Sequence, residues 1–223
     1  MSRRILPSGE TALLVECDDL ADVLVLHDLL AADRPHGLID LVPAARTVLV
    51  GVDPRRLPLE SAAAWIRRAG AGAEAARPDT AHPGAQPETA QPEAPPASAV
   101  VPVVYDGEDL AATADLLGLS PEALAARHRA AHWRVAFIGF APGFAYLVAD
   151  DWPFEVPRLD APRTRVPAGA LGLAGPFSGA YPRQSPGGWR LIGRTDAVLW
   201  DPDAPSPALL APGTRVRFEA AAS

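Results

Sequence analysis

A stretch rich in proline and alanine divides this chain and constrains its fold more than any other feature. Residues 71–98 contain six prolines, no aromatic residue and almost no large aliphatic residue. Such a segment buries too little apolar surface to offset the entropy lost on ordering it. We therefore interpret 71–98 as a semi-rigid linker between two domains. The alternative is an ordered, extended arm lying on a domain surface.

The first predicted domain, residues 1–70, has the pattern of a small α+β unit. Three apolar runs predict strands, at 11–16, 39–42 and 47–52. Helical spacing of apolar residues predicts two helices, at 20–32 and 58–68. The resulting order of strand, helix, strand, strand and helix is close to a ferredoxin-like arrangement.

The second predicted domain, residues 99–223, is mostly β. A strand at 100–105 and two short helices at 109–117 and 121–128 open it, and Ser120 is a good N-cap for the second helix. Short apolar runs then alternate with glycine and proline, at 135–138, 170–174, 189–192, 197–200 and 216–218. This alternation is typical of a mostly antiparallel β-barrel or sandwich.

Charge and composition exclude several classes of function. The net charge is −7, which disfavours nucleic-acid binding because that needs a basic face. No stretch is apolar enough to predict a membrane span, and the N-terminus lacks the pattern of a signal peptide. The single Cys17 fits a reducing cytoplasm, where we expect the protein to reside. The sequence contains arginine but no lysine, so lysine chemistry is excluded from this chain.

The window 158–194 carries the strongest functional signal. It holds seven glycines, six arginines and a single acidic residue, Asp160. Guanidinium groups bind carboxylate or phosphate through paired hydrogen bonds, and glycine allows the backbone to approach a ligand closely. We therefore predict a site for an anionic ligand. The candidate residues are Arg163, Arg165 and Arg194 as the clamp, with Ser185, Gly187 and Gly188 as support. The alternative is that these arginines point outward from strands and pair with acidic residues elsewhere.

The same window offers no clear catalytic group. Ser185 has no base near it in sequence, and Ser-Pro-Gly-Gly is ordinary turn chemistry. The stretch 188–195 fits a phosphate loop except for arginine in the lysine position, but its middle is strand-like, so no nucleotide loop is predicted. His128 and His132 are spaced as metal ligands on a helix could be, yet no carboxylate accompanies them, and no metal site is predicted. Catalytic residues remain unassigned.

A second motif, Gly-Phe-Ala-Pro-Gly-Phe at 139–144, places apolar side chains on a rigid turn. It is either core packing at a corner of the barrel or the wall of a pocket or a partner-binding loop. The candidate residues are Gly139, Phe140, Pro142, Gly143 and Phe144. His128 is the neighbouring residue that we expect to point toward this loop.

These motifs together resemble the family of the 5-oxoprolinase B subunit. The resemblance rests on FIGFAPGFAYL at 137–147, PRL at 157–159, PRTRVPAG at 162–169, YP at 181–182, SPGGW at 185–189 and LIGRT at 191–195. It extends to GETALLV at 9–15 and VPA at 42–44, so it covers nearly the whole chain outside the linker. The chain departs from the family at 176–179, where Pro-Phe-Ser-Gly replaces the usual Gly-Gln-Thr-Gly.

The resemblance implies a cyclophilin-like β-barrel for the second domain. It implies two partners, a homologous C subunit plus a further A subunit, in a complex that hydrolyses 5-oxo-L-proline to L-glutamate at the expense of ATP. We expect the nucleotide to be held by no phosphate loop of this chain and the chain to be inactive alone. The family also includes the sporulation kinase inhibitor KipI and subunits of allophanate- and urea-type amidohydrolases or carboxyltransferases. A KipI-like inhibitor of a sensor histidine kinase and a subunit of such a urea-type enzyme are therefore the alternatives.

Overall fold

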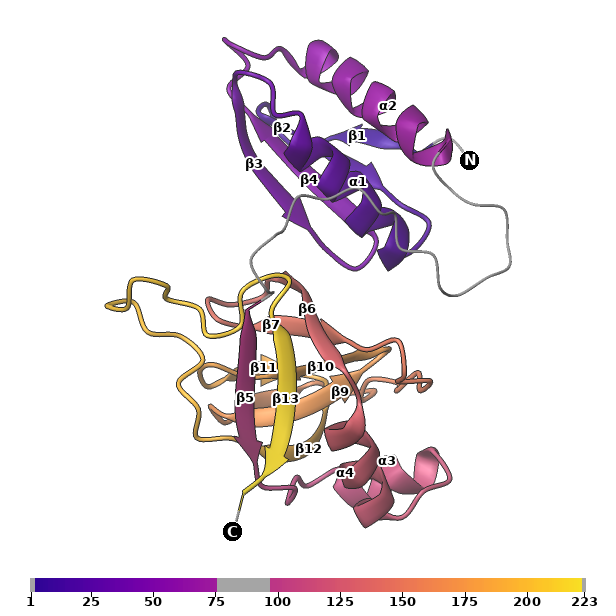
Figure 1. Ribbon diagram of the computed structural model, residues 1–223, viewed down its shortest axis with the longest axis vertical. Helices are drawn as coiled ribbons and strands as arrows, with labels where there is room; N and C mark the ends of the chain where they lie inside the picture. The colour runs from indigo at the N-terminus through magenta and orange to yellow at the C-terminus, as the bar shows by residue number, and fades with distance from the viewer. Residues whose placement is uncertain (1–2, 76–96, 222–223) are drawn as a thin grey trace. The chain divides into compact units, whose positions relative to one another are not determined.

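The computed structural model describes residues 3–75 and 97–221. The described residues form two compact units, one from 3–75 and one from 97–221 (Figure 1). Both ends of the predicted linker belong to regular structure, because a helix extends to Ala75 and a strand begins at Ser98. The rest of the predicted linker lies outside the described residues.

The N-terminal unit is a four-stranded antiparallel sheet with two helices. Its elements are β1 (Ile5–Pro7), β2 (Ala12–Glu16), α1 (Leu20–Ala32), β3 (Leu38–Pro43), β4 (Thr47–Val52) and α2 (Leu59–Ala75). The sheet order is β1-β2-β4-β3. The elements from β2 to α2 follow the predicted order, while the short edge strand β1, which pairs with β2, was not predicted. Alternating residues of β4 (Val48, Val50 and Val52) are fully buried and belong to the core beneath the helices.

Local sequence signals place the starts of two helices. The Asp19 carboxylate accepts a hydrogen bond of 2.8 Å from the Asp22 backbone N–H at the start of α1. The Ser120 hydroxyl accepts one of 3.2 Å from the Ala123 N–H at the start of the helix that follows Ser120. Each bond satisfies a backbone donor that the first turn of a helix leaves unpaired.

The C-terminal unit is a seven-stranded barrel with two helices. Its elements are β5 (Ser98–Val103), α3 (Leu110–Leu116), α4 (Pro121–Ala130), β6 (Trp133–Ile138), β7 (Ala145–Val148), β8 (Arg163–Val166), β9 (Ala170–Ala174), β10 (Phe177–Ala180), β11 (Ser185–Gly187), β12 (Arg190–Arg194) and β13 (Arg215–Ala220). The barrel strands follow the order β12-β9-β10-β7-β6-β13-β5, and β8 pairs with β11 in a separate ribbon. All pairs are antiparallel except β13 with β5.

Two backbone hydrogen bonds close the barrel. The Val104 N–H donates to the Arg194 carbonyl and the Arg194 N–H to the Val104 carbonyl, each at 2.9 Å, so the chain just after β5 meets the end of β12. The predicted combination of an α+β unit and a mostly antiparallel barrel is confirmed. The predicted strand at 197–200 is wrong, because only Trp200 of that stretch forms an isolated bridge, to Ala208.

Strand β9 separates two apolar layers, which is why all of its residues are buried. Leu171 and Leu173 belong to the main core of the barrel. Ala170 and Ala174 belong to a second cluster with Phe144, Tyr181 and Trp189, on the outer side of the same strand. The aromatic residues of the loop at 139–144 thus cover the outside of the barrel.

The helices of the described residues include none that is both long enough and apolar enough to cross a membrane.

Candidate functional site

A pocket of about 560 Å³ lies in the aromatic layer outside β7, β9 and β10. Its lining consists of Phe140, Phe144, Tyr146, Glu155, Arg158, Pro162, Ala174, Gly175, Pro176, Phe177, Tyr181, Pro186, Gly187 and Trp189. The lining therefore draws on segments from 140 to 189, which only the folded barrel brings together. All of these residues belong to the C-terminal unit.

Edge-to-face aromatic contacts build the wall of the pocket. The ring centroid of Trp189 lies 5.3 Å from that of Phe144 and 5.5 Å from that of Tyr146. Tyr146 also meets Phe177 at 5.5 Å, and Phe144 meets Tyr181 at 5.2 Å. These distances are typical of favourable aromatic pairs, so the rings support one another as a preformed wall.

Small residues of the sheet allow the rings to lie on it. A Cβ atom at Gly179 of β10 would stand 2.8 Å from the Ala145 carbonyl oxygen and 3.1 Å from the Trp189 ring. No side chain fits at that distance, so glycine here sets the depth of the aromatic layer.

The loop at 139–144 holds one aromatic residue in an unusual conformation. Phe140 has φ of 67°, the only positive φ outside glycine among the described residues, and its side chain is 58% exposed. A bulky residue in the left-handed region is strained, and such strain concentrates at functional sites. Gly143 of the same turn has φ of 80°, where glycine has no steric cost.

The polar groups of the pocket are few. Arg158 is its one basic residue and Glu155 its one acidic residue. Burial raises the pKa of the Tyr146 and Tyr181 hydroxyls, and nearby Arg158 acts in the opposite direction on the pKa of both. Both tyrosines therefore stay neutral at pH 7, with hydroxyls able to donate a hydrogen bond. Such a site suits a small, nearly planar anion whose charge meets Arg158.

The residues of the predicted anion clamp lie elsewhere. Arg163 of β8 pairs with Glu108 at 2.6 Å and with Asp109 at 2.7 Å. Arg194 pairs with Asp106 at 2.9 Å. Arg165 is exposed on β8 and is not part of the pocket lining. The acidic partners come from the segment before α3, far from the arginine window in sequence, so a count of charge within the window could not include them.

Of the three residues predicted to support the clamp, only Gly187 lines the aromatic pocket. Gly187 lines the pocket beside Tyr181. The Gly188 carbonyl accepts a hydrogen bond of 2.9 Å from the Leu159 N–H, which ties the loop carrying Arg158 to the end of the β11 ribbon. The Ser185 hydroxyl donates to the Arg183 carbonyl at 3.3 Å and does not line the pocket.

Of the predicted loop residues, Phe140 and Phe144 line the pocket, whereas Gly139, Pro142 and Gly143 are not part of its lining. Sequence reasoning did not select Arg158, Tyr146 or Trp189. The signal for Arg158 was present in the motif PRL at 157–159, which belongs to the family resemblance.

His128 does not point toward the loop at 139–144. The imidazole ring is fully buried. Its Nδ1 atom lies 2.8 Å from the Tyr105 hydroxyl oxygen, and its Nε2 atom lies 2.8 Å from the Ser178 hydroxyl oxygen. Trp133, Trp152 and Phe218 surround the imidazole. Burial lowers the pKa of His128 to about 3, so the ring is neutral at pH 7 and forms part of the barrel interior.

Comparison with curated proteins finds relatives over about half of the chain. The chain is 46% identical to the 5-oxoprolinase B subunit of Escherichia coli O157:H7 over 121 residues, which are 53% of this chain and 56% of that protein. It is 41% identical to the 5-oxoprolinase B subunit of Bacillus subtilis (strain 168) over 121 residues, which are 53% of this chain and 50% of that protein. The match thus spans about half the length of these curated relatives.

Solved structures resemble nearly the whole chain. The crystal structure of TTHA0988 in space group P6522 has a TM-score of 0.71 and 34% identity, and the match covers 96% of this chain and 40% of that one. Urea amidolyase of K. lactis has a TM-score of 0.73 at 16% identity, over 98% of this chain and 15% of that one, which shows a shared fold. The family model of the carboxyltransferase domain, subdomain C and D, matches residues 3–210. The chain therefore belongs to the family defined by the carboxyltransferase domain, subdomain C and D.

Proposed function

We propose that this chain is the B subunit of an ATP-dependent 5-oxoprolinase and that its aromatic pocket holds 5-oxo-L-proline. The observation that carries the proposal is an aromatic wall with one arginine, Arg158, and no second basic residue in the lining. The substrate is a small lactam ring with a carboxylate. The ring fits between the aromatic side chains, Arg158 binds the carboxylate, and Glu155 accepts a hydrogen bond from the lactam N–H.

The names of the relatives support this function. Both curated relatives carry the name of the 5-oxoprolinase B subunit, which favours a component of an enzyme over an inhibitor of a sensor kinase. Phe177, in the pocket, occupies the position where the family usually has glutamine, so the wall of this chain is more apolar there.

The pocket lacks the groups needed to open the ring alone. Its lining contains no histidine, cysteine, serine or lysine, and Glu155 is its one carboxylate. The stretch that resembles a phosphate loop forms strand β12 and is not followed by a helix, so the described residues do not fit a nucleotide in that way. We therefore assign nucleotide binding and ring opening to an assembled cytoplasmic complex that also contains the C and A subunits.

The proposal is tested by measuring 5-oxo-L-proline binding to the purified chain by calorimetry and the KM of the complex reconstituted with its partner subunits. Arg158→Gln should weaken binding and raise KM by roughly 10- to 150-fold, the effect of losing one charge-assisted contact. The matched control is Arg183→Gln, an exposed arginine outside the pocket, which should change neither quantity.

The purified chain without partners should show no ATP hydrolysis dependent on 5-oxoproline. Turnover by the chain alone would overturn its assignment as a dependent subunit. Unchanged binding and KM for Arg158→Gln would remove this pocket as the substrate site.

A further inference from the structure

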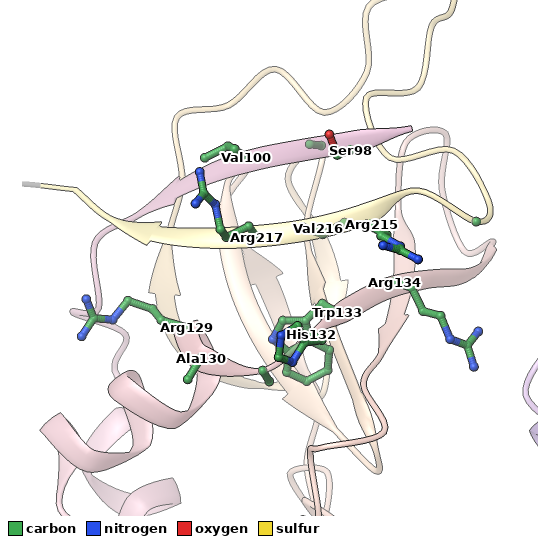
Figure 2. Close-up of a pocket in the computed structure, with 13 residues that line it drawn as sticks. Ser98, Val100, Arg129, Ala130, His132, Trp133, Arg134, Arg215, Val216 and Arg217 are labelled. Carbon is green, nitrogen blue, oxygen red and sulfur yellow. The ribbon is translucent and has the colours of Figure 1, made fainter. Parts of the chain in front are cut away.

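A second cavity, of about 840 Å³, lies where α4 ends and β6 begins, beside β13 and β5 (Figure 2). Its lining includes four arginines and a histidine but no aspartate or glutamate. The basic residues are Arg129, Arg134, His132, Arg215 and Arg217. We call this cavity the basic groove; it shares no residue with the aromatic pocket.

The register of the barrel places two of these arginines directly opposite each other. Arg215 of β13 is the antiparallel partner of Arg134 of β6. The next pair, Val216 and Trp133, is buried at 4% and 1% exposure, so the arginines stand on the outward face. Like charges directly opposite on neighbouring strands destabilise a sheet. The fold itself therefore gains nothing from this pair.

Acidic side chains offset only part of the charge of the groove. Arg217 pairs with Glu219 at 2.8 Å, and His132 is 2.7 Å from Asp151. Within residues 3–75 and 97–221, no ion pair is found for Arg129, Arg134 or Arg215. An uncompensated positive surface in a chain of net charge −7 is suited to an anionic ligand.

The arrangement of the basic groups indicates the kind of ligand. In Figure 2, Arg129 lies at one end of the groove in the last turn of α4, and Arg134 lies at the other end on β6. The guanidinium groups point in different directions rather than at one point, so they do not form a cage for a single phosphate. Val100 of β5, 48% exposed, is the partner of Arg217 and adds an apolar contact along the groove.

We propose that the basic groove binds an acidic segment of a partner protein in an extended conformation. Side chains of an extended segment alternate between its two sides, so acidic residues at every second position face the same way. Those acidic residues can then contact the outward-facing Arg215 of β13 and Arg134 of β6. The acidic charge of the chain as a whole disfavours a nucleic acid, whose binding depends on a generally positive surface. Charge complementarity of this type determines which partner is accepted and how fast it associates.

The test measures the fluorescence anisotropy of a labelled peptide of alternating glutamate and valine, titrated with the full chain at low and at high salt. The peptide should bind, and high salt should weaken its binding. The double variant Arg134→Gln, Arg215→Gln should bind it roughly ten-fold more weakly. The matched control, Arg165→Gln with Arg183→Gln, removes two exposed arginines elsewhere on the same unit and should bind like the natural chain.

A thermal melt of the free variants separates binding from a role in the fold. Removing one of two opposed arginines relieves repulsion, so Arg215→Gln should melt at the same temperature as the natural chain or slightly higher. A lower melting temperature would assign the arginines to the fold and overturn the proposal. Absence of peptide binding, or an equal loss in the control variant, would overturn it as well.

Two competitors check the class of ligand. Inorganic phosphate at the same ionic strength as the chloride buffer should not displace the peptide; if it does, the groove is a site for small anions. A short DNA duplex should not bind in the groove, and tighter binding of DNA that depends on Arg134 and Arg215 would contradict the choice of a protein partner.

Discussion

Arg163 is fixed at both ends of its guanidinium group by acidic residues. Its Nε lies 2.6 Å from Glu108, its Nη2 lies 2.7 Å from Asp109, and its side chain is 22% exposed. Asp109 also accepts a hydrogen bond of 2.7 Å from the Leu191 N–H. The arginine thus joins β8, β12 and the segment before α3.

We expect Arg163→Lys to lower the free energy of unfolding by about 1–3 kcal/mol, because lysine keeps the charge but loses the planar fork. Chemical denaturation measures this change. Arg165→Lys, at an exposed arginine of the same strand, is the control and should be neutral. Unchanged stability together with weaker 5-oxoproline binding would instead support the anion clamp predicted from the sequence.

His128 makes the stability of the barrel depend on pH. Burial lowers its pKa from 6.5 to about 3 in the folded chain. Between these values the unfolded chain binds a proton at this ring and the folded chain does not, so the free energy of unfolding falls as pH falls. The slope contributed by one such group is at most about 1.4 kcal/mol per pH unit.

Chemical denaturation between pH 7 and pH 4 should therefore show a steeper loss of stability for the natural chain than for His128→Gln. Glutamine does not titrate, yet it offers a donor and an acceptor to Tyr105 and Ser178. The difference between the two slopes isolates His128 from carboxylates that titrate in the same range. Equal slopes would show that the imidazole takes up its proton in the folded state.

At the scale of the element, β9 and β10 have small residues on their outer face, and the aromatic layer packs against that face. β9 alternates leucine toward the barrel interior with alanine and glycine toward the aromatic residues. The same principle places Gly179 beneath Trp189 and Phe144. Small residues at these positions are what allow a pocket to form on the outside of a closed barrel.

Gly179→Ala should displace this aromatic layer, because its Cβ would meet the Ala145 carbonyl at 2.8 Å. We expect a loss of about 1–3 kcal/mol in the free energy of unfolding, as for other overpacked sites, and a changed near-ultraviolet circular dichroism spectrum. Gly139→Ala is the control, since its Cβ would have 3.8 Å to the nearest atom, on Tyr146. An unchanged spectrum and stability for Gly179→Ala would mean that the layer shifts without cost.

At the scale of the whole molecule, the sequence was sufficient to predict the class of each unit. Helix α1 begins and ends at the predicted residues, because its cap and its apolar spacing are local signals. The short strands β7, β8, β10 and β11 were missed, because a strand of three or four residues is too short to show a periodicity.

In the candidate site too, local motifs were readable in the sequence, whereas contacts between distant segments were not. The motif at 139–144 and the motif at 157–159 both contribute to the pocket, and both are readable in the sequence. The predicted arginines were chosen by local charge density, but Glu108 and Asp109 reach Arg163 only after the barrel has closed.

The sequence by itself determined the family, the four helices and the longer strands, since apolar periodicity, caps and long motifs are properties of neighbouring residues. The tertiary structure decided which side chains meet. Barrel closure at Val104 and Arg194 pairs the arginine window with distant acidic residues. The folded barrel also buries His128, and the register of β6 with β13 leaves Arg134 opposite Arg215. Charge pairing and burial depend on distances in space, and those distances exist only in the folded chain.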